Sequence, residues 1–139
     1  MSFLLDTNVV SEWVKPSPNP GVIAWTADVD EDRVFLSVVT LTELRYGIER
    51  MPVSSRRKRL AEWLEEELPL RFEGRILAID PATADTCGKL VASSEARGRR
   101  IEAMDAFIAA TAAVHHLTIV TRNTSDFEAV AADTLNPWV

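Results

Sequence analysis

Short apolar runs alternate along the chain with segments of helical periodicity. Four runs predict buried strands, at 3–5, 34–37, 76–79 and 118–121, and a fifth short strand is expected near 134–135. The intervening segments predict helices at about 8–15, 22–29, 40–51, 54–68, 80–95 and 103–115. Strands that alternate with helices in this way indicate an α/β domain with a short, mostly parallel sheet covered by helices on both faces.

Capping signals mark where several of these helices begin. Thr7 or Asn8 can cap the first helix. Thr40 and Glu43 fit a capping box, in which the glutamate reaches back to the backbone of the cap residue. Asp80 and the proline after it follow the order of N-cap and first helical position. An acid within such a signal therefore has a structural interpretation beside any chemical one.

The length and composition are those of one ordinary globular domain. The chain has 139 residues, of which 47% are hydrophobic and 26% charged. No apolar run approaches the roughly 18–20 residues of a membrane span, so we expect no membrane association. The single cysteine, Cys87, cannot form an intramolecular disulfide, so we expect a cytoplasmic protein in which Cys87 is a small core residue.

The net charge of −6 at first argues against nucleic-acid binding, which usually needs a basic surplus. Basic residues are nevertheless clustered at 56–59 and 97–100. Carboxylates that bind divalent cations can also reverse the local field of an acidic protein. Composition alone leaves nucleic-acid binding open.

Asp105 is the only charged residue in the almost wholly apolar segment 103–114. A helix that is apolar on nearly all sides is buried, and an ionised carboxylate there is costly unless something compensates it. The alternative is an acid near a helix N-terminus, where the helix dipole favours negative charge. The residue alone does not decide between a structural and a functional role.

Three further acids occupy positions that suit a site at one edge of the sheet. Asp6 directly follows the first strand, and the carboxyl ends of parallel strands are where ligands bind. Glu43 has Gly47 one turn later, which would allow close backbone approach or room for a ligand. Asp126 and Asn123 follow the fourth strand in a polar segment that also reads as a turn. Each has a structural alternative, but their coincidence favours a common site.

Carboxylates gathered in one place repel each other unless a cation joins them. A few oxygen ligands completed by water are what Mg²⁺ or Mn²⁺ requires, and such a centre supports in-line displacement at a phosphodiester. The chain contains no phosphate loop, no nucleophile elbow and no dinucleotide fingerprint. The acids therefore predict metal-dependent phosphodiester chemistry.

Four segments, in order along the chain, carry a resemblance to a known family. They are Leu4-Leu5-Asp6-Thr7-Asn8-Val9-Val10-Ser11-Glu12, Thr40-Leu41-Thr42-Glu43-Leu44-Arg45-Tyr46-Gly47, Ala103-Met104-Asp105-Ala106-Phe107-Ile108-Ala109-Ala110-Thr111-Ala112, and Thr121-Arg122-Asn123 through Asp126-Phe127 to Leu135-Asn136-Pro137-Trp138. The sequence resembles bacterial PIN domains over its whole length. Within that family it looks most like the VapC and FitB toxins of type II toxin–antitoxin pairs.

The resemblance implies a single PIN domain over 1–139, with a three-layer α/β/α fold, a homodimer and a Mg²⁺- or Mn²⁺-dependent ribonuclease site. Asp6, Glu43 and Asp105 correspond by position to the acidic triad of the family, with Asp126 as the fourth acid unless Asn123 completes the site. The residues that would position the site or substrate are Thr7, Asn8, Thr121 and Asn123. Arg45, Arg50 and Arg122 are candidates for contacts with substrate phosphates, although solvent-facing arginines are the default interpretation.

The resemblance also implies partners. A small cognate antitoxin of the VapB or FitA kind would occupy the groove, and its own DNA-binding part would regulate the operon. Contact with DNA would then be only indirect.

Two other classes of function are alternatives. A phosphatase with Asp6 as aspartyl nucleophile usually needs a second acid two residues later, where this chain has Asn8. A non-enzymatic alternative is a regulatory binding module, either a receiver-like domain or a catalytically silent PIN homologue that only pairs with a partner. A receiver would need adjacent early acids and a late lysine, which the sequence lacks, whereas a silent homologue should have lost one of its acids.

Overall fold

The computed structural model describes residues 1–139 and contains one five-stranded sheet in which every neighbouring pair of strands is parallel. The order across the sheet is β3-β2-β1-β4-β5. The strands are β1 (Phe3–Leu5), β2 (Val34–Ser37), β3 (Ile76–Leu77), β4 (Thr118–Val120) and β5 (Thr134–Leu135). All five predicted strands are present, and the sheet expected to be mostly parallel is parallel throughout.

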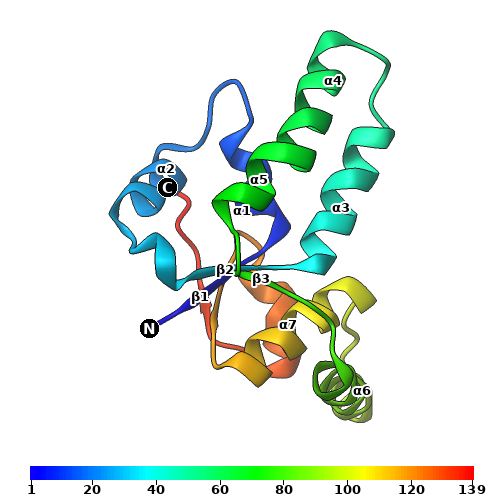
Figure 1. The fold of residues 1–139 in the computed structure, drawn as a ribbon. Coiled ribbons are helices and arrows are strands. Elements are labelled where there is room, and N and C mark those ends of the chain that lie inside the picture. The colour runs from blue at the N-terminus through cyan, green and yellow to red at the C-terminus, as the bar shows by residue number, and fades with distance from the viewer.

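Helices cover both faces of this sheet. The α-helices are α1 (Thr7–Trp13), α2 (Pro20–Asp28), α3 (Val38–Glu49), α4 (Ser55–Glu62), α5 (Leu68–Arg71), α6 (Pro81–Ala96) and α7 (Ala103–His115). Two 3₁₀ segments, η1 (Glu31–Arg33) and η3 (Thr124–Val130), and one π-helical turn, η2 (Trp63–Glu67), complete the chain. Figure 1 shows α6 and α7 on one side of the strands and α1, α2, α4 and α5 on the other. This is the three-layer α/β/α arrangement expected for the chain.

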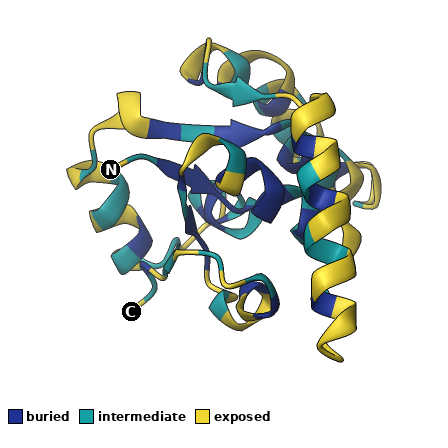
Figure 2. Cartoon of the chain, turned by 90° about the horizontal axis from the view of Figure 1, so that it is seen from below, coloured by how far each residue is buried: buried dark blue, intermediate teal, exposed yellow.

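Alternate side chains of the strands supply two separate cores, because successive residues of a strand point to opposite faces. Leu5 and Leu36 pack with residues of α1, α3 and α5 in the larger cluster. Leu4 and Ile119 pack with Ile108 of α7 in the smaller cluster. Figure 2 shows the buried residues concentrated along the strands and the exposed ones on the outer faces of the helices. No helix combines the length and the apolar character that crossing a membrane would require.

Three helices begin earlier than the sequence predicts, and one of them is α2, which begins at Pro20 instead of Val22. The N-cap of α1 is Asp6, which confirms the structural alternative for that acid and not the cap expected at Thr7 or Asn8, since the Asp6 carboxylate accepts the Thr7 N–H at 2.8 Å. The N-cap of α3 is Ser37 rather than Thr40, and its hydroxyl accepts the Val39 N–H at 3.0 Å. The predicted capping box is therefore wrong: its threonine already lies inside the helix, and its glutamate is free for other contacts.

The predicted helix over 54–68 is interrupted rather than continuous. It divides into α4, the π turn η2 and α5. Pro69 lies in the first turn of α5, and its ring would clash with the carbonyl four residues earlier in a regular α-helix. The Leu68 N–H instead bonds to the Trp63 carbonyl, five residues back, which widens the helix at this point.

The strand order places a topological switch point beside β1. From β1 the chain moves outward to β2 and β3 on one side, and it later returns to β4 and β5 on the other. Ligands of open parallel sheets bind outside the carboxyl ends of strands at such a point. Asp6 directly follows β1 and Thr121 directly follows β4, so both residues reach this position.

Candidate active site

Asp6 is both a helix cap and a buried acid at the switch point. Its side chain is only 6% exposed. Its Oδ1 accepts the Thr7 N–H at 2.8 Å, and its Oδ2 accepts the Thr121 hydroxyl at 2.8 Å. Burial raises the pKa of Asp6 against the opposing effect of these hydrogen bonds, and Asp126 raises it further. Asp6 therefore caps α1, and this role is compatible with the predicted catalytic one.

Thr121 links the ends of β1 and β4. Besides donating to Asp6, its hydroxyl oxygen accepts the Asn123 N–H at 3.0 Å and the Asn8 side-chain amide at 3.3 Å. The Asn8 carbonyl oxygen in turn accepts the Arg122 N–H at 3.4 Å. The predicted positioning residues thus form one network around the Asp6 carboxylate.

Glu43 reaches the same place from α3. Its Oε1 accepts the Thr7 hydroxyl at 2.6 Å, and that hydroxyl also lies 3.3 Å from the Thr40 hydroxyl. Burial raises the pKa of Glu43, with further contributions from Asp6 and Glu102. Of the two alternatives at Gly47, close backbone approach is absent, because a Cβ there would meet nothing within 4 Å. The space beside Gly47 is open.

Asp105, in the first turn of α7, has the most strongly shifted pKa of the group. Burial is the largest cause, and together with repulsion from four nearby carboxylates, in the decreasing order Asp6, Asp126, Glu102 and Glu43, it raises the pKa of Asp105 from 3.8 to about 7. Every other acid of the predicted set therefore raises the pKa of Asp105. Its neutral form competes with its charged form near neutral pH unless a cation is present.

Asp126 occupies a 3₁₀ helix, η3, rather than the turn that its polar neighbours suggested. It is exposed at the rim of the cleft, and it raises the pKa of both Asp6 and Asp105. Asn123 immediately precedes η3, and its side chain makes no capping hydrogen bond there. Both residues line the same cleft.

The cleft has a volume of about 410 Å³ and is almost wholly polar. Acids outnumber bases among its lining residues, which are Asp6, Thr7, Asn8, Ser11, Glu12, Lys15, Glu43, Glu102, Asp105, Arg122, Asn123, Asp126 and Trp138. All four predicted acids are therefore brought together. Arg45 and Arg50 are not: Arg45 pairs with Glu65 at 2.8 Å, and Arg50 lies over the Tyr46 ring.

Two acids of the cleft were missed in the sequence. Glu102 is the N-cap of α7 without a capping hydrogen bond, and its position three residues before Asp105 was the available signal. Glu12 is 5% exposed, pairs with Lys15 at 2.8 Å and accepts the Asn19 N–H at 2.9 Å. The Lys15 hydrogen bond is the main cause that lowers the pKa of Glu12, so this acid is charged and tied to the cleft wall.

The donor set suits a hard divalent cation whose shell is completed by water. No three acidic, histidine or cysteine side chains lie close enough together to hold one ion directly. Mg²⁺ commonly keeps several waters and takes only one or two carboxylates from the protein. Asp6, Glu43, Asp105 and Asp126 offer only oxygen donors, and their mutual repulsion would be relieved by positive charge.

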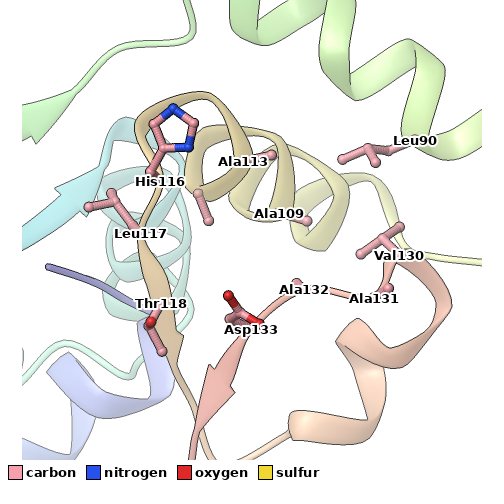
Figure 3. Close-up of a pocket in the computed structure, with 11 residues that line it drawn as sticks. Leu90, Ala109, Ala113, His116, Leu117, Thr118, Val130, Ala131, Ala132 and Asp133 are labelled. Atoms are coloured by element: carbon pink, nitrogen blue, oxygen red, sulfur yellow. The ribbon is translucent and has the colours of Figure 1, made fainter. Parts of the chain in front are cut away.

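A second cavity lies at the opposite edge of the sheet. It measures about 290 Å³ and is bounded by the later turns of α7, the start of β4 and the end of η3. Figure 3 shows Ala109, Ala113 and Leu90 beside it, with His116 and Asp133 as polar groups at its border. None of the predicted acids lines this cavity, so the candidate chemistry is confined to the carboxyl edge.

Known proteins resemble this chain over nearly its full length. Toxin FitB of Neisseria gonorrhoeae is 39% identical, and plasmid stability protein StbB of Pseudomonas syringae pv. tomato is 42% identical, each over 97% of both chains. VapC ribonuclease Y4jK of Sinorhizobium fredii is 38% identical, over 97% of this chain and 96% of its own. A solved structure of FitAB bound to the IR36 DNA fragment matches with a TM-score of 0.92 at 36% identity, covering 99% of this chain and 96% of the other.

The family model of the PIN domain matches residues 3–133. That span runs from β1 to the residue before β5 and so contains every acid of the cleft. The chain therefore belongs to the PIN-domain family.

Proposed function

We propose that this chain is the toxin of a type II toxin–antitoxin pair and that it cleaves RNA phosphodiester bonds with the help of Mg²⁺ or Mn²⁺. Similarity to proteins named toxin FitB and VapC ribonuclease supports the toxin and nuclease parts of this proposal. The acid cleft at the switch point supplies the chemical part.

The observation that carries the proposal is the electrostatic state of Asp105. Its pKa of about 7 results from burial and from four neighbouring carboxylates. Such repulsion destabilises the fold by itself, and a bound cation would relieve it. Perturbed acids that share a cleft are typical of functional sites.

The chain's own residues would hold the site ready before substrate binds. Thr121 and the Thr7 amide orient Asp6, while the Thr7 hydroxyl orients Glu43. Asp6, Glu43 and Asp105, with Asp126 beside them, would hold a divalent ion partly through bound waters, because no three of these side chains lie within direct ligand range. Such an ion would supply activation of water and stabilisation of the negative charge that develops at the phosphate. Lys15 and Arg122 line the cleft and are placed to attract the phosphates of the substrate.

The proposed partners follow from the relatives. We expect a small antitoxin of the VapB or FitA kind, contact with DNA only through that antitoxin, and a homodimer of the toxin. The DNA-bound FitAB structure supports the first two expectations. A cytoplasmic location also stays a prediction.

One observation favours a second candidate, a catalytically silent PIN domain that acts only by pairing with a partner. No three side chains lie within direct ligand range of one ion. In such a module the acids would contact basic groups of the partner instead of a metal. Metal dependence therefore separates the two candidates.

The experiment uses purified protein free of any partner, incubated with structured cellular RNAs and Mn²⁺ or Mg²⁺. Asp105→Asn is compared with Asp28→Asn, which makes the same chemical change at an exposed residue outside the cleft. We expect cleavage by the parent and by Asp28→Asn, and no cleavage by Asp105→Asn or in the presence of a chelator. Cleavage that survives both Asp105→Asn and the chelator would contradict the proposal.

A further inference from the structure

The basic loop between α6 and α7 lies beside the acid cleft. A further cavity, which is polar and has a volume of about 480 Å³, is lined by Gly98, Arg99 and Arg100 of this loop. It shares three acids with the acid cleft, namely Glu102, Asp105 and Asp126. The two cavities are therefore neighbours across the same carboxylates.

The loop is held in place by hydrogen bonds to the buried residue Ser94. The Ser94 side chain is fully buried, and its hydroxyl donates to the Arg99 carbonyl at 2.6 Å. The Arg99 N–H returns a bond to the Ser94 carbonyl at 3.0 Å. Gly98 adopts the left-handed conformation that ends the α6 helix, with φ of +73°. The backbone of the loop thus has a fixed position relative to the cleft.

The guanidinium groups of the loop differ in their availability. Arg97 donates to the Ala129 carbonyl and so fastens the loop to η3. Arg99 has only a distant neighbour, Glu128, at 4.0 Å, and its side chain is 55% exposed. Arg100 is exposed and takes part in none of the ion pairs of the structure. Two guanidinium groups therefore line the cavity, and neither has a close ion pair with a protein acid.

Cationic side chains line both of the cavities that share these carboxylates. Lys15 and Arg122 line the acid cleft but not the adjoining cavity, whereas Arg99 and Arg100 line that cavity but not the cleft. The acids common to both are Glu102, Asp105 and Asp126. A polyanion with regularly spaced charges, such as a single RNA strand, can contact both cationic groups while one of its phosphates lies over the acids.

We propose that Arg99 and Arg100 bind backbone phosphates of the RNA strand that crosses the acid cleft, on the side opposite Lys15 and Arg122. This inference rests on the proposed ribonuclease function and names the surface that holds its substrate. The contacts are to phosphates, so they add affinity without reading sequence.

The test compares Arg99→Gln/Arg100→Gln with Lys58→Gln/Arg59→Gln. The control removes the same charge from exposed residues of α4, which lies on the other side of the sheet (Figure 1). Both pairs are made in an Asp105→Asn background that cannot turn over RNA. Binding of a labelled, mixed-sequence single-stranded RNA is measured by fluorescence anisotropy across a salt series with Mg²⁺ present.

For the Arg99→Gln/Arg100→Gln variant, the plot of log affinity against log salt should become less steep, by about 0.7 for each phosphate that the variant no longer neutralises. Its RNA binding should also be weaker, on the order of twenty-fold at about 0.1 M salt. The control pair should leave the slope unchanged. Arg99→Lys/Arg100→Lys should keep the slope, because the charge is retained. Melting temperatures of all variants establish that the fold is intact.

An unchanged slope in the loop pair, or an equal weakening of RNA binding in the loop and control pairs, would overturn the inference while leaving the proposed function standing. Binding of labelled poly-glutamate is measured in the same way. If the loop pair loses binding to poly-glutamate but keeps its RNA binding, the loop binds an acidic polypeptide, and the inference is also overturned. A background protein that binds no RNA at any salt concentration would overturn the inference and the proposed substrate together.

Discussion

Asp6 and Asp80 have the same local role but opposite electrostatics. Each follows a strand, caps the next helix and accepts a backbone N–H at 2.8 Å. Asp80 is exposed, and the hydrogen bond from the Thr83 backbone is the main cause that lowers its pKa. Asp6 is buried, and burial raises its pKa despite its hydrogen bonds. A cap therefore stabilises the charged form only where solvent or a cation also accommodates it.

The difference comes from the position of the two strands in the sheet. Asp80 follows edge strand β3, whereas Asp6 follows central strand β1 at the switch point. The central position brings Asp6 together with acids from α3, α7 and η3. The same sequence signal thus marks a structural cap at the edge and a candidate ligand at the centre.

The largest expected effect is a difference in the rate of RNA cleavage between variants of these two aspartates. Asp6→Asn should lower the rate of RNA cleavage by more than about 10²-fold, because even outer partners of metal ligands contribute roughly 10–100-fold. Asp80→Asn should leave the rate unchanged, since Asn is also a good N-cap. Initial rates of cleavage at saturating Mn²⁺ measure both. Equal losses in the two variants would show that capping, and not the cleft, accounts for the effect.

A somewhat smaller effect is expected from the hydroxyl that holds Asp6. Thr121→Val removes the 2.8 Å hydrogen bond to the Asp6 carboxylate, and it should weaken metal binding or activity by about 10–100-fold. Thr111→Val is the matched control, because the buried Thr111 hydroxyl donates only to the Phe107 carbonyl of its own helix. Metal affinity is measured by titration calorimetry. Equal affinity in the two variants would mean that Asp6 needs no orientation by Thr121.

The pH dependence of stability should show the repulsion directly in metal-free protein. The folded-state pKa of Asp105 is about 7, above its ordinary value of 3.8, so the folded state holds a proton that the unfolded state has released between these values. The contribution of Asp105 to stability is therefore fully present below about pH 4 and is lost as the pH rises through 7.

Asp105→Asn removes this loss and should raise the free energy of unfolding of metal-free protein at pH 8 by about 1 kcal/mol, a figure reduced from the full shift because solvent screens this partly exposed carboxylate. Chemical denaturation with chelator at pH 5 and pH 8 measures it. A variant less stable than the parent at pH 8 would contradict the assigned repulsion.

The smallest expected effect is at Asp80, at the edge of the sheet. There the pH dependence of stability should have the opposite sign to that at Asp105. The lowered pKa of Asp80 means that its contribution to stability is present above pH 3.8 and is lost as the pH falls through its folded-state pKa. Asp80→Ala should lower the melting temperature at pH 7, and the difference from the parent should disappear in acid. A melting temperature that rises at pH 7 would remove the contrast with Asp105.

Much of the fold was predictable because its local signals agree with one another. The strand at Val34–Ser37 and the helix at Ala103–His115 have the predicted bounds, and Asp80 caps α6 as expected. The start of α3 was not predictable in the same way: Ser37 ends β2 and caps the helix at once, whereas Thr40 and Glu43 offered a capping box three residues later. The π turn was hidden because Glu62 to Leu68 reads as an ordinary helix.

The candidate site divides in a similar way. The acids at strand ends and in the apolar helix stood out because their surroundings did not match their charge, as with Asp105 in α7. Glu12 and Glu102 did not stand out, since each also fits an ordinary helical surface. Their placement depends on tertiary packing that brings α1 and α7 to one cleft.

The central claim is that repulsion among these acids is the signature of a cation site. Titration calorimetry of metal-free protein with Mn²⁺ at pH 7, in buffers of different ionisation enthalpy, tests it most directly. The account predicts saturable binding with release of a proton, because Asp105 is partly protonated at that pH. Asp105→Asn should weaken the binding and abolish the proton release, while Asp80→Asn should match the parent. Absence of saturable binding by the parent would contradict the account.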